Sequence, residues 1–309
     1  NKQIHDLLQG NLLEVTNWER HMILMYPAIQ KLHWHRQEPE WKCAGAGVEF
    51  SHLGDERGHV RCDGRGAEGG SLFCALAFFF EHFAHDSLLQ DFPPPREPID
   101  TPNRLPVLEK LPAFELEPSR LLRWLAVLVG DLHQPLHWLR EYDYGQSLEV
   151  VYQNSNYTLL SLWEDYLPSR LPPKPSAEAL HRQYEEREAS WRDTVPTQLF
   201  RDWAKETADV LCHAVYAAME VKHGDGSRGI DKTFNLDEEL FRRWLNLAQE
   251  FTTLGGQRLA FVLQTILEHR RHAVASQEGR GRHMSQRRAI RRWSWNLCKN
   301  ACIAAVVVP

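Results

Sequence analysis

The stretch SRLLRWLAVLVGDLHQPLHWLRE, residues 119–141, decides the fold. Apolar side chains cover almost every face of a helix drawn through it, which is typical of a helix at the centre of a domain. The motif GDLHQPLHW (130–138) places Asp131, His133 and His137 in this apolar segment. Burying a carboxylate and two imidazoles is costly unless they pair or bind a metal ion. The two histidines are four residues apart, so one helical face can present both, although the proline between them must distort the helix.

Helical spacing of apolar residues recurs outside the central segment. In the clearest case the run LFCALAFFF follows Ser71, a candidate N-cap. Near the C-terminal end of the pattern, the pair Gly255–Gly256 predicts a kink or break. The best strand signal is LEVVYQ at 148–153. The further predicted helices span residues 17–32, 71–85, 157–167, 176–191, 199–222 and 237–272.

Two segments predict long loops instead of helices. Residues 44–70 are rich in glycine and charge, and residues 92–118 contain eight prolines, which excludes a long helix there. Long loops in a compact domain are typical of binding surfaces or insertions. We therefore predict an all-α chain, with one helical domain over residues 1–270 and an extension over residues 271–309. The domain has long loops and a short β-hairpin at most.

Charge is distributed unevenly along the chain. The segment after Arg270 holds eight basic residues against one acid, so it carries +7 while residues 1–270 carry −12, within an overall net charge of −5. An acidic body attracts a nucleic-acid backbone poorly. No apolar run reaches 18 residues, so a complete transmembrane helix is not expected. The chain starts at Asn1 without a methionine, as expected of a processed or trimmed form.

GDLHQPLH resembles the signature HxxxDxHQPLH of the S1/P1 family of zinc-dependent nucleases. The resemblance spans about residues 4–268 in register, and its most specific pieces are HQPLH and GQRLA. It implies a phospholipase C/P1 nuclease-like helical fold. Other stretches resemble the family's segments in the same order, namely NWER…KLHWHRQEP (17–39), CDGRGAEGGSLFCALAFFF (62–80), YGQS (144–147), LLSLWEDYL (159–167), WAKETADVLCHAVY (203–216) and TTLGGQRLAFVLQTIL (252–267).

Members of this family cut phosphoester bonds with three clustered zinc ions, so the resemblance implies a set of metal ligands. Several ligand positions keep a donor, with a glutamate in place of an aspartate at the last of them: His33, Asp131, His137 and Glu164. Other ligand positions have lost the donor, and in this sequence they are occupied by Arg20, Val127 and Leu160. The family's N-terminal Trp and a nearby His lie in a segment that this sequence does not contain.

This ligand count predicts an eroded zinc site, because a zinc site normally needs at least three protein ligands. We expect at most one zinc ion, held through His33 and Asp131 or through His137 and Glu164. Two alternatives stay open. Arg20 can pair with Asp131 in place of a metal, or the histidines of the HQPLH motif can be hydrogen-bonded core residues.

Three functions follow as hypotheses. The preferred one is a non-catalytic pseudoenzyme that acts as a structural or accessory subunit of a larger assembly. The alternative is a zinc-dependent endonuclease or 3′-nucleotidase acting on single-stranded nucleic acid, with Asp131 as a catalytic residue. The third is a module that holds a nucleotide by aromatic stacking without cleaving it. The sequence leaves open whether the chain is an enzyme, and the lost ligands favour a protein that is not one.

The cysteines also follow the resemblance, which implies the disulfides Cys62–Cys74 and Cys43–Cys212. Such bonds indicate an oxidising compartment, such as the secretory pathway or an organelle lumen, reached through a leader peptide that is then removed.

The C-terminal extension falls outside the resemblance. Its arginines flank two tryptophans and an apolar run, ACIAAVVV, follows. This pattern favours a membrane surface or the groove of a protein partner, and the long loops offer further contact surfaces. A disordered tail, or the start of a membrane anchor, are the alternatives. The residues concerned are Arg287, Arg288, Arg291, Arg292, Trp293 and Trp295.

Overall fold

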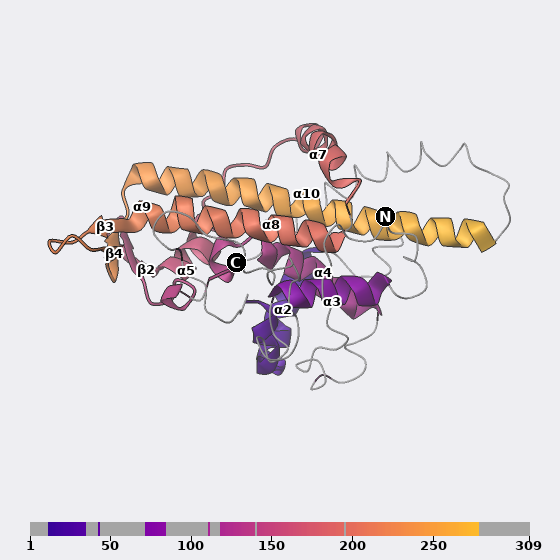
Figure 1. The fold of residues 1–309 in the computed structure, drawn as a ribbon, viewed down its shortest axis with the longest axis horizontal. Coiled ribbons are helices and arrows are strands. Elements are labelled where there is room, and N and C mark those ends of the chain that lie inside the picture. The colour runs from indigo at the N-terminus through magenta and orange to yellow at the C-terminus, as the bar shows by residue number, and fades with distance from the viewer. Residues whose placement is uncertain are drawn as a thin grey trace.

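A computed structural model describes residues 12–34, 43, 72–84, 111, 118–139, 141–194 and 196–277. The chain is mainly helical, which confirms the predicted fold class. In Figure 1 the long helix α10 runs beside α8, and α7 lies on the opposite side of α10 from α3 and α4. These five helices are α3 (Leu72–Ala84), α4 (Pro118–Leu132), α7 (Ala177–Trp191), α8 (Pro196–Val210) and α10 (Glu238–Gln277).

A further α-helix, α2 (Leu12–Met25), precedes these five in the chain. The remaining helical elements are short 3-10, π-helical and α-helical turns. In chain order they are η1 (Pro27–Leu32), η5 (Pro135–His137), η6 (Glu141–Asp143), α5 (Leu159–Ser161), η7 (Leu162–Tyr166), α6 (Leu167–Ser169), η8 (Leu211–Tyr216) and α9 (Ala217–Met219).

The strand content is larger than the single hairpin that the sequence predicted. The expected strand at 148–153 is present as β1 (Glu149–Tyr152), which pairs antiparallel with β2 (Ser155–Thr158) and parallel with β5 (Thr233–Asn235). A separate hairpin joins β3 (Glu220–Lys222) and β4 (Arg228–Ile230). These additional strands are three residues long, too short for an alternating apolar pattern to reveal them.

Helix α4 is central, as its apolar sequence predicted. It packs against both α3 and α10. The ring of Trp124 is almost fully buried, with Trp18 edge-on at a centroid distance of 5.0 Å and Phe79 stacked at 5.8 Å. Aromatic groups of α2 and α3 therefore close over one side of α4, while α10 covers another.

The predicted helix over 119–141 is too long. Helix α4 ends at Leu132, and Gln134 is extended, with φ −91° and ψ 110°. The cause is Pro135, because a residue before proline is disfavoured in the helical region. A short 3-10 turn, η5, follows. The prediction that His133 and His137 share a helical face was therefore wrong, since the chain leaves the helix between them.

Of the kink or break predicted at Gly255–Gly256, the break was wrong. Helix α10 is continuous from Glu238 to Gln277 and passes residue 270, where the domain boundary had been drawn. Gly255 instead allows the backbone of α10 to approach His133 closely, because a Cβ atom built on the glycine would lie 3.2 Å from Cγ of His133. The glycine thus lets α10 contact the end of α4.

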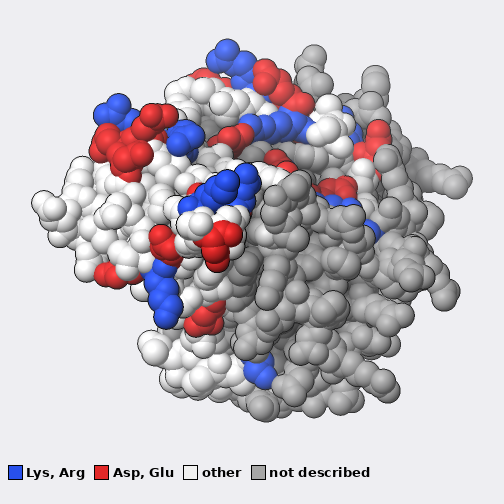
Figure 2. All heavy atoms as spheres, turned by 60° about the vertical axis from the view of Figure 1, so that its left-hand side comes forward, with Lys and Arg blue, Asp and Glu red and all other residues white. Residues whose placement is uncertain are grey.

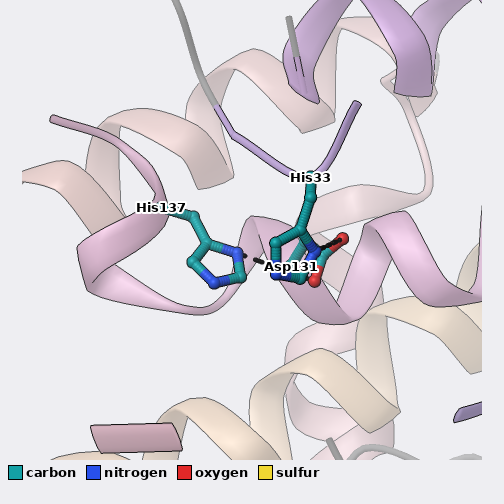
Figure 3. Close-up of side chains that lie close together, drawn as sticks. All are labelled: His33, Asp131 and His137. Carbon is teal, nitrogen blue, oxygen red and sulfur yellow. Dashed lines mark ion pairs between the residues drawn. The ribbon is translucent and has the colours of Figure 1, made fainter. Parts of the chain in front are cut away.

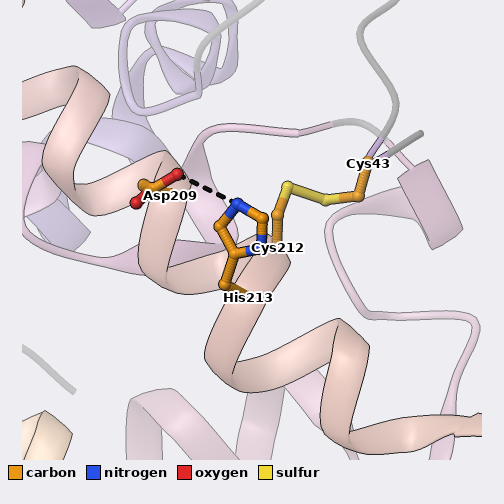
Figure 4. The surroundings of a disulfide bond; sticks show 4 residues. All are labelled: Cys43, Asp209, Cys212 and His213. Carbon is orange, nitrogen blue, oxygen red and sulfur yellow. Dashed lines mark ion pairs between the residues drawn. A yellow bond between two sulfur atoms is a disulfide. The ribbon is translucent and has the colours of Figure 1, made fainter. Parts of the chain in front are cut away.

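The disulfide Cys43–Cys212 confirms one predicted pair (Figure 4). It joins residues 169 positions apart, and closing so long a loop restricts the unfolded chain by about 5 kcal/mol. Cys74 is also disulfide-bonded, and its predicted partner Cys62 lies outside the described residues. A disulfide is typical of an oxidising compartment.

Among the described residues, no helix combines the length and the apolar character needed to cross a bilayer. On the face shown in Figure 2, acidic and basic side chains intermingle over the described part of the surface. The predicted membrane or partner contacts of the C-terminal extension fall on residues 287–295, which lie outside the described residues, and stay predictions.

Candidate metal centre

Three of the predicted ligands meet in one cluster. The donor atoms of His33, Asp131 and His137 all lie within 4.8 Å of one another (Figure 3). His33 directly follows η1, Asp131 occupies the last turn of α4, and His137 ends η5. Nδ1 of His33 lies 2.9 Å from Oδ2 of Asp131, and Nδ1 of His137 lies 3.6 Å from Oδ1 of the same carboxylate.

A further carboxylate lies beside each histidine. Oε1 of Glu164, the fourth predicted ligand, lies 2.9 Å from Nε2 of His137. Oε1 of Glu19 lies 3.4 Å from Nδ1 of His33, and Glu19 is buried. The cluster therefore contains five potential donors, two imidazoles and three carboxylates.

Glu19 is a site residue that the sequence analysis missed. The resemblance of the NWER stretch to the family's corresponding segment pointed to Arg20, one residue later, as the ligand position. The order Trp18–Glu19, an aromatic residue followed by an acid, was the available signal. The side chain of Arg20 lies outside the described part of the structure, so its pairing with Asp131 stays a prediction.

The donor set fits one divalent ion. Four polar atoms at its centre are buried: both carboxylate oxygens of Asp131, Nδ1 of His33 and Nδ1 of His137. They contact one another at ion-pair distance but without the geometry of a hydrogen bond. Buried polar atoms left in this way are costly unless a partner satisfies them. Imidazole nitrogen and carboxylate oxygen are ligands that zinc prefers, and three protein ligands are enough for one site.

Burial and neighbouring charge shift the protonation of the cluster. Burial raises the pKa of Asp131 to about 7, the Glu19 carboxylate adds to the rise, and His33 opposes it. Burial lowers the pKa of His33, but Asp131 and Glu19 together outweigh it and leave that pKa well above its usual value. Burial and the nearby His33 lower the pKa of His137 to about 4. His137 is therefore neutral at physiological pH, as a metal ligand must be, and a bound cation would displace protons from the His33–Asp131 pair.

Aromatic rings form one wall of the cluster. The ring of Trp34 lies 4.5 Å from that of His137, 4.8 Å from that of His33 and 4.6 Å from that of Tyr144. Tyr144 is buried and has a left-handed backbone, φ 57°, at the start of the YGQS segment. A non-glycine residue in this region costs of order 1–3 kcal/mol, so surrounding contacts must hold the tyrosine against Trp34.

His133 does not join the cluster. Its Nδ1 lies 2.6 Å from the carbonyl oxygen of Val129, and its Nε2 lies 3.0 Å from Nη1 of Arg258. Burial and the charge of Arg258 lower the pKa of His133 to about 3. Of the two motif histidines, His133 thus corresponds to the hydrogen-bonded core alternative, while His137 faces the cluster.

Apolar side chains occupy two of the ligand positions inferred from the resemblance. Val127 is buried on α4, one turn before Asp131. Leu160, on α5, is partly buried and packs against the hydrophobic core. Neither side chain can donate to a metal. Among the described residues, the cluster able to hold an ion is the one formed by His33, Asp131 and His137.

The chain belongs to the S1/P1 nuclease family, because residues 107–268, more than half of its length, match that family. The match includes Asp131, His137 and Glu164, whereas Glu19 and His33 precede it. Among characterised proteins, the chain is similar to Nuclease S1 of Aspergillus oryzae, with 24% identity over 166 residues. That stretch covers 48% of this chain and 55% of the relative, so the chain spans about half of the relative's length.

Proposed function

We propose that this S1/P1 nuclease-like protein binds one divalent metal ion, most simply zinc, and acts as a non-catalytic structural or accessory subunit of a larger assembly. The observation that carries the proposal is the composition of the site. The site keeps a compact group of three donors, whereas two former ligand positions hold Val127 and Leu160, whose apolar side chains are packed in the protein.

The residues around the cluster support a structural role for the ion. His33, Asp131 and His137 come from three separate elements, so their shared ion would tie η1, α4 and η5 together. Glu164 would orient the imidazole of His137 through its outer nitrogen, Nε2, as carboxylates commonly do for metal-bound histidines. Glu19 lies at the same nitrogen of His33 as Asp131 and would face the ion itself. A bound zinc ion supplies a fixed positive charge and Lewis acidity, but clamping both the attacking and the leaving oxygens of a phosphoester requires more than one ion.

The second candidate is a zinc-dependent endonuclease or 3′-nucleotidase that hydrolyses single-stranded nucleic acid, with Asp131 as a catalytic residue. Glu19 favours it, because this buried carboxylate adds a fifth donor to the cluster. The relative named Nuclease S1 supports the same chemistry by similarity.

Metal content and hydrolysis distinguish the two candidates. The full chain, dialysed after exposure to zinc, should hold about one zinc ion by mass spectrometry, and D131N should hold none. The control H213N changes an exposed histidine, which pairs with Asp209, and should bind as wild type. Near three ions per chain, together with cleavage of single-stranded DNA at mildly acidic pH, would establish the enzyme instead. No bound zinc in the wild-type chain would refute the metal site.

A gain of binding tests the lost ligand position. L160H places an imidazole about one helical turn before Glu164, the residue whose carboxylate contacts His137. The variant should bind a second zinc ion or bind the first at least tenfold more tightly, by roughly 1.4 kcal/mol. A folded L160H protein with unchanged stoichiometry and affinity would show that residue 160 is not a former ligand position.

The compartment and partners form part of the same proposal. The Cys43–Cys212 disulfide supports an oxidising compartment of the secretory pathway or an organelle, reached after removal of a leader peptide. The basic and apolar extension supports contact with a protein partner or a membrane surface. Flotation of the full chain with anionic vesicles tests the membrane contact, since a variant with Trp293 and Trp295 changed to serine should float less. Equal flotation would exclude it.

A further inference from the structure

The two most specific sequence motifs contact each other in the folded protein. His133 comes from the motif at 130–138, and Arg258 comes from the GGQRL segment of α10. Both side chains are buried, and Nη1 of Arg258 lies 3.0 Å from Nε2 of His133. Nη2 of Arg258 pairs with the carboxylate of Glu206 on α8. One guanidinium therefore joins the end of α4 to α8 and α10.

The contact fixes the tautomer of His133. A guanidinium only donates hydrogen bonds, so Nε2 of His133 must accept from Arg258. The proton then sits on Nδ1, which donates to the carbonyl oxygen of Val129 at 2.6 Å. Both ring nitrogens are satisfied, and the ring plane is set by two bonds that point in different directions.

The surrounding residues leave the pair little freedom to move. The guanidinium carbon of Arg258 lies 4.9 Å from the ring centroid of Trp203 and 5.9 Å from that of Trp191. On the other side, Gly255 brings the backbone of α10 so close that an added Cβ would lie 3.2 Å from Cγ of His133. The imidazole is thus held between the α10 backbone and its two hydrogen-bond partners.

His133 lies in the segment that carries two of the proposed metal ligands. His133 lies two residues after Asp131 and four before His137, in the segment where the chain leaves α4 and enters η5. We propose that Arg258 is a positioning residue for the metal centre, holding through His133 the segment that carries Asp131 and His137. This inference rests on the single-metal site proposed above.

Three variants of the full chain separate positioning from general stabilisation. R258M removes the N–H donors and the charge, and R258K keeps the charge and N–H donors on a single ammonium group but loses the guanidinium fork. R187M is the matched control, because Nη1 of Arg187 donates to Oε1 of Gln257 at 2.6 Å, a neighbouring contact of α10 that does not involve His133. Zinc affinity is measured by competition with a chromophoric chelator, and ligand geometry by the visible absorption of bound Co²⁺, well below each variant's unfolding temperature.

R258M should bind zinc roughly 10–100-fold more weakly, as found when outer-shell partners of metal ligands are removed, and its Co²⁺ spectrum should shift. R258K loses the guanidinium fork that reaches both His133 and Glu206, so it should bind more weakly than the wild type but more tightly than R258M, and R187M should match the wild type. A folded R258M protein with wild-type affinity and spectrum would overturn the inference. If R258M does not fold, R258K decides, since wild-type binding by a variant that has lost the guanidinium fork would equally overturn it.

A metal-free measurement distinguishes failure of this inference from failure of the proposed function. Nitrogen resonances of the imidazoles of His33 and His137 are compared in wild type, R258M and R187M without metal. A shift at His137 in R258M alone supports positioning, even if the wild-type chain binds no zinc and the metal site is refuted. Unchanged resonances in R258M overturn the positioning role, whatever the zinc content.

Discussion

Replacing Gly255 with alanine should destabilise the protein, although alanine favours a helix more than glycine does. The added Cβ would lie 3.2 Å from Cγ and 3.3 Å from Nδ1 of His133. The ring cannot turn away without giving up its bonds to Val129 or Arg258. Overpacking of this kind costs about 1–3 kcal/mol, against a gain of about 1 kcal/mol in helix propensity. We expect a net loss of about 1–2 kcal/mol, because the partners that fix His133 leave little room for relaxation.

Urea unfolding under non-reducing conditions measures this change, with G224A as the control. Gly224 lies between β3 and β4, and a Cβ built there meets nothing within 4 Å, so G224A should stay within about 0.5 kcal/mol of the wild type. A G255A protein as stable as the wild type, or more stable, would refute the reasoning. It would show that the end of α4 yields freely and that the approach of α10 to His133 is not a tight constraint.

Three further outcomes follow from the structure. Removing the Cys43–Cys212 bond with C212S should lower the free energy of unfolding by about 5 kcal/mol, measured by urea denaturation, and the C43S/C212S double variant should lose no more. The pKa of His133 falls from 6.5 to about 3, so the unfolded chain gains a proton below pH 6.5 that the folded chain does not take up. The free energy of unfolding should therefore decrease by up to about 1.4 kcal/mol per unit as the pH is lowered from 6.5 to about 3, and H133N should remove this part of the slope. Burial raises the pKa of Asp131 to about 7, and the pKa of His33, lowered by burial but raised more by Asp131 and Glu19, lies well above its usual value, so both ligands must release a proton on binding. Zinc affinity, measured by chelator competition, should therefore fall by more than about tenfold per unit as pH drops below 7, and a flat profile would contradict the protonation of these ligands.

Much of the fold could be predicted because its signals are local. The apolar face of α4, the N-terminal boundary of α3 and the extent of α7 follow from the spacing of residues within each helix. The long-range disulfide Cys43–Cys212 was predicted from the family resemblance, since no local pattern pairs cysteines 169 residues apart.

The errors concern contacts between distant segments. Nothing within α10 shows that Gly255 faces His133, so the glycine was interpreted as a break instead of a close approach. Likewise, the match to the family's motif pointed to Arg20 and did not indicate Glu19, the neighbouring residue whose buried carboxylate approaches His33. A shift of one residue along α2 changes which side chain enters the site, and only packing against the rest of the fold determines it.

The carboxylate of Asp131 gives the sharpest test of whether the cluster serves a cation. In metal-free protein it is fully buried, is repelled by Glu19 and makes no well-formed hydrogen bond, so its pKa is raised and its charge destabilises the folded state above pH 7. D131N removes that charge, but it also leaves the buried His33 without its partner, and removing one member of a buried pair typically costs about 3–5 kcal/mol. The effect of zinc on each protein is therefore compared. Zinc at 100 times its dissociation constant should stabilise the wild type by about 2.7 kcal/mol and D131N by almost nothing. Thermal unfolding of both proteins with zinc and with a chelator measures the two effects. If zinc stabilises the wild type no more than it stabilises D131N, the buried carboxylate has no cation to balance it, and the metal centre proposed for this fold does not exist.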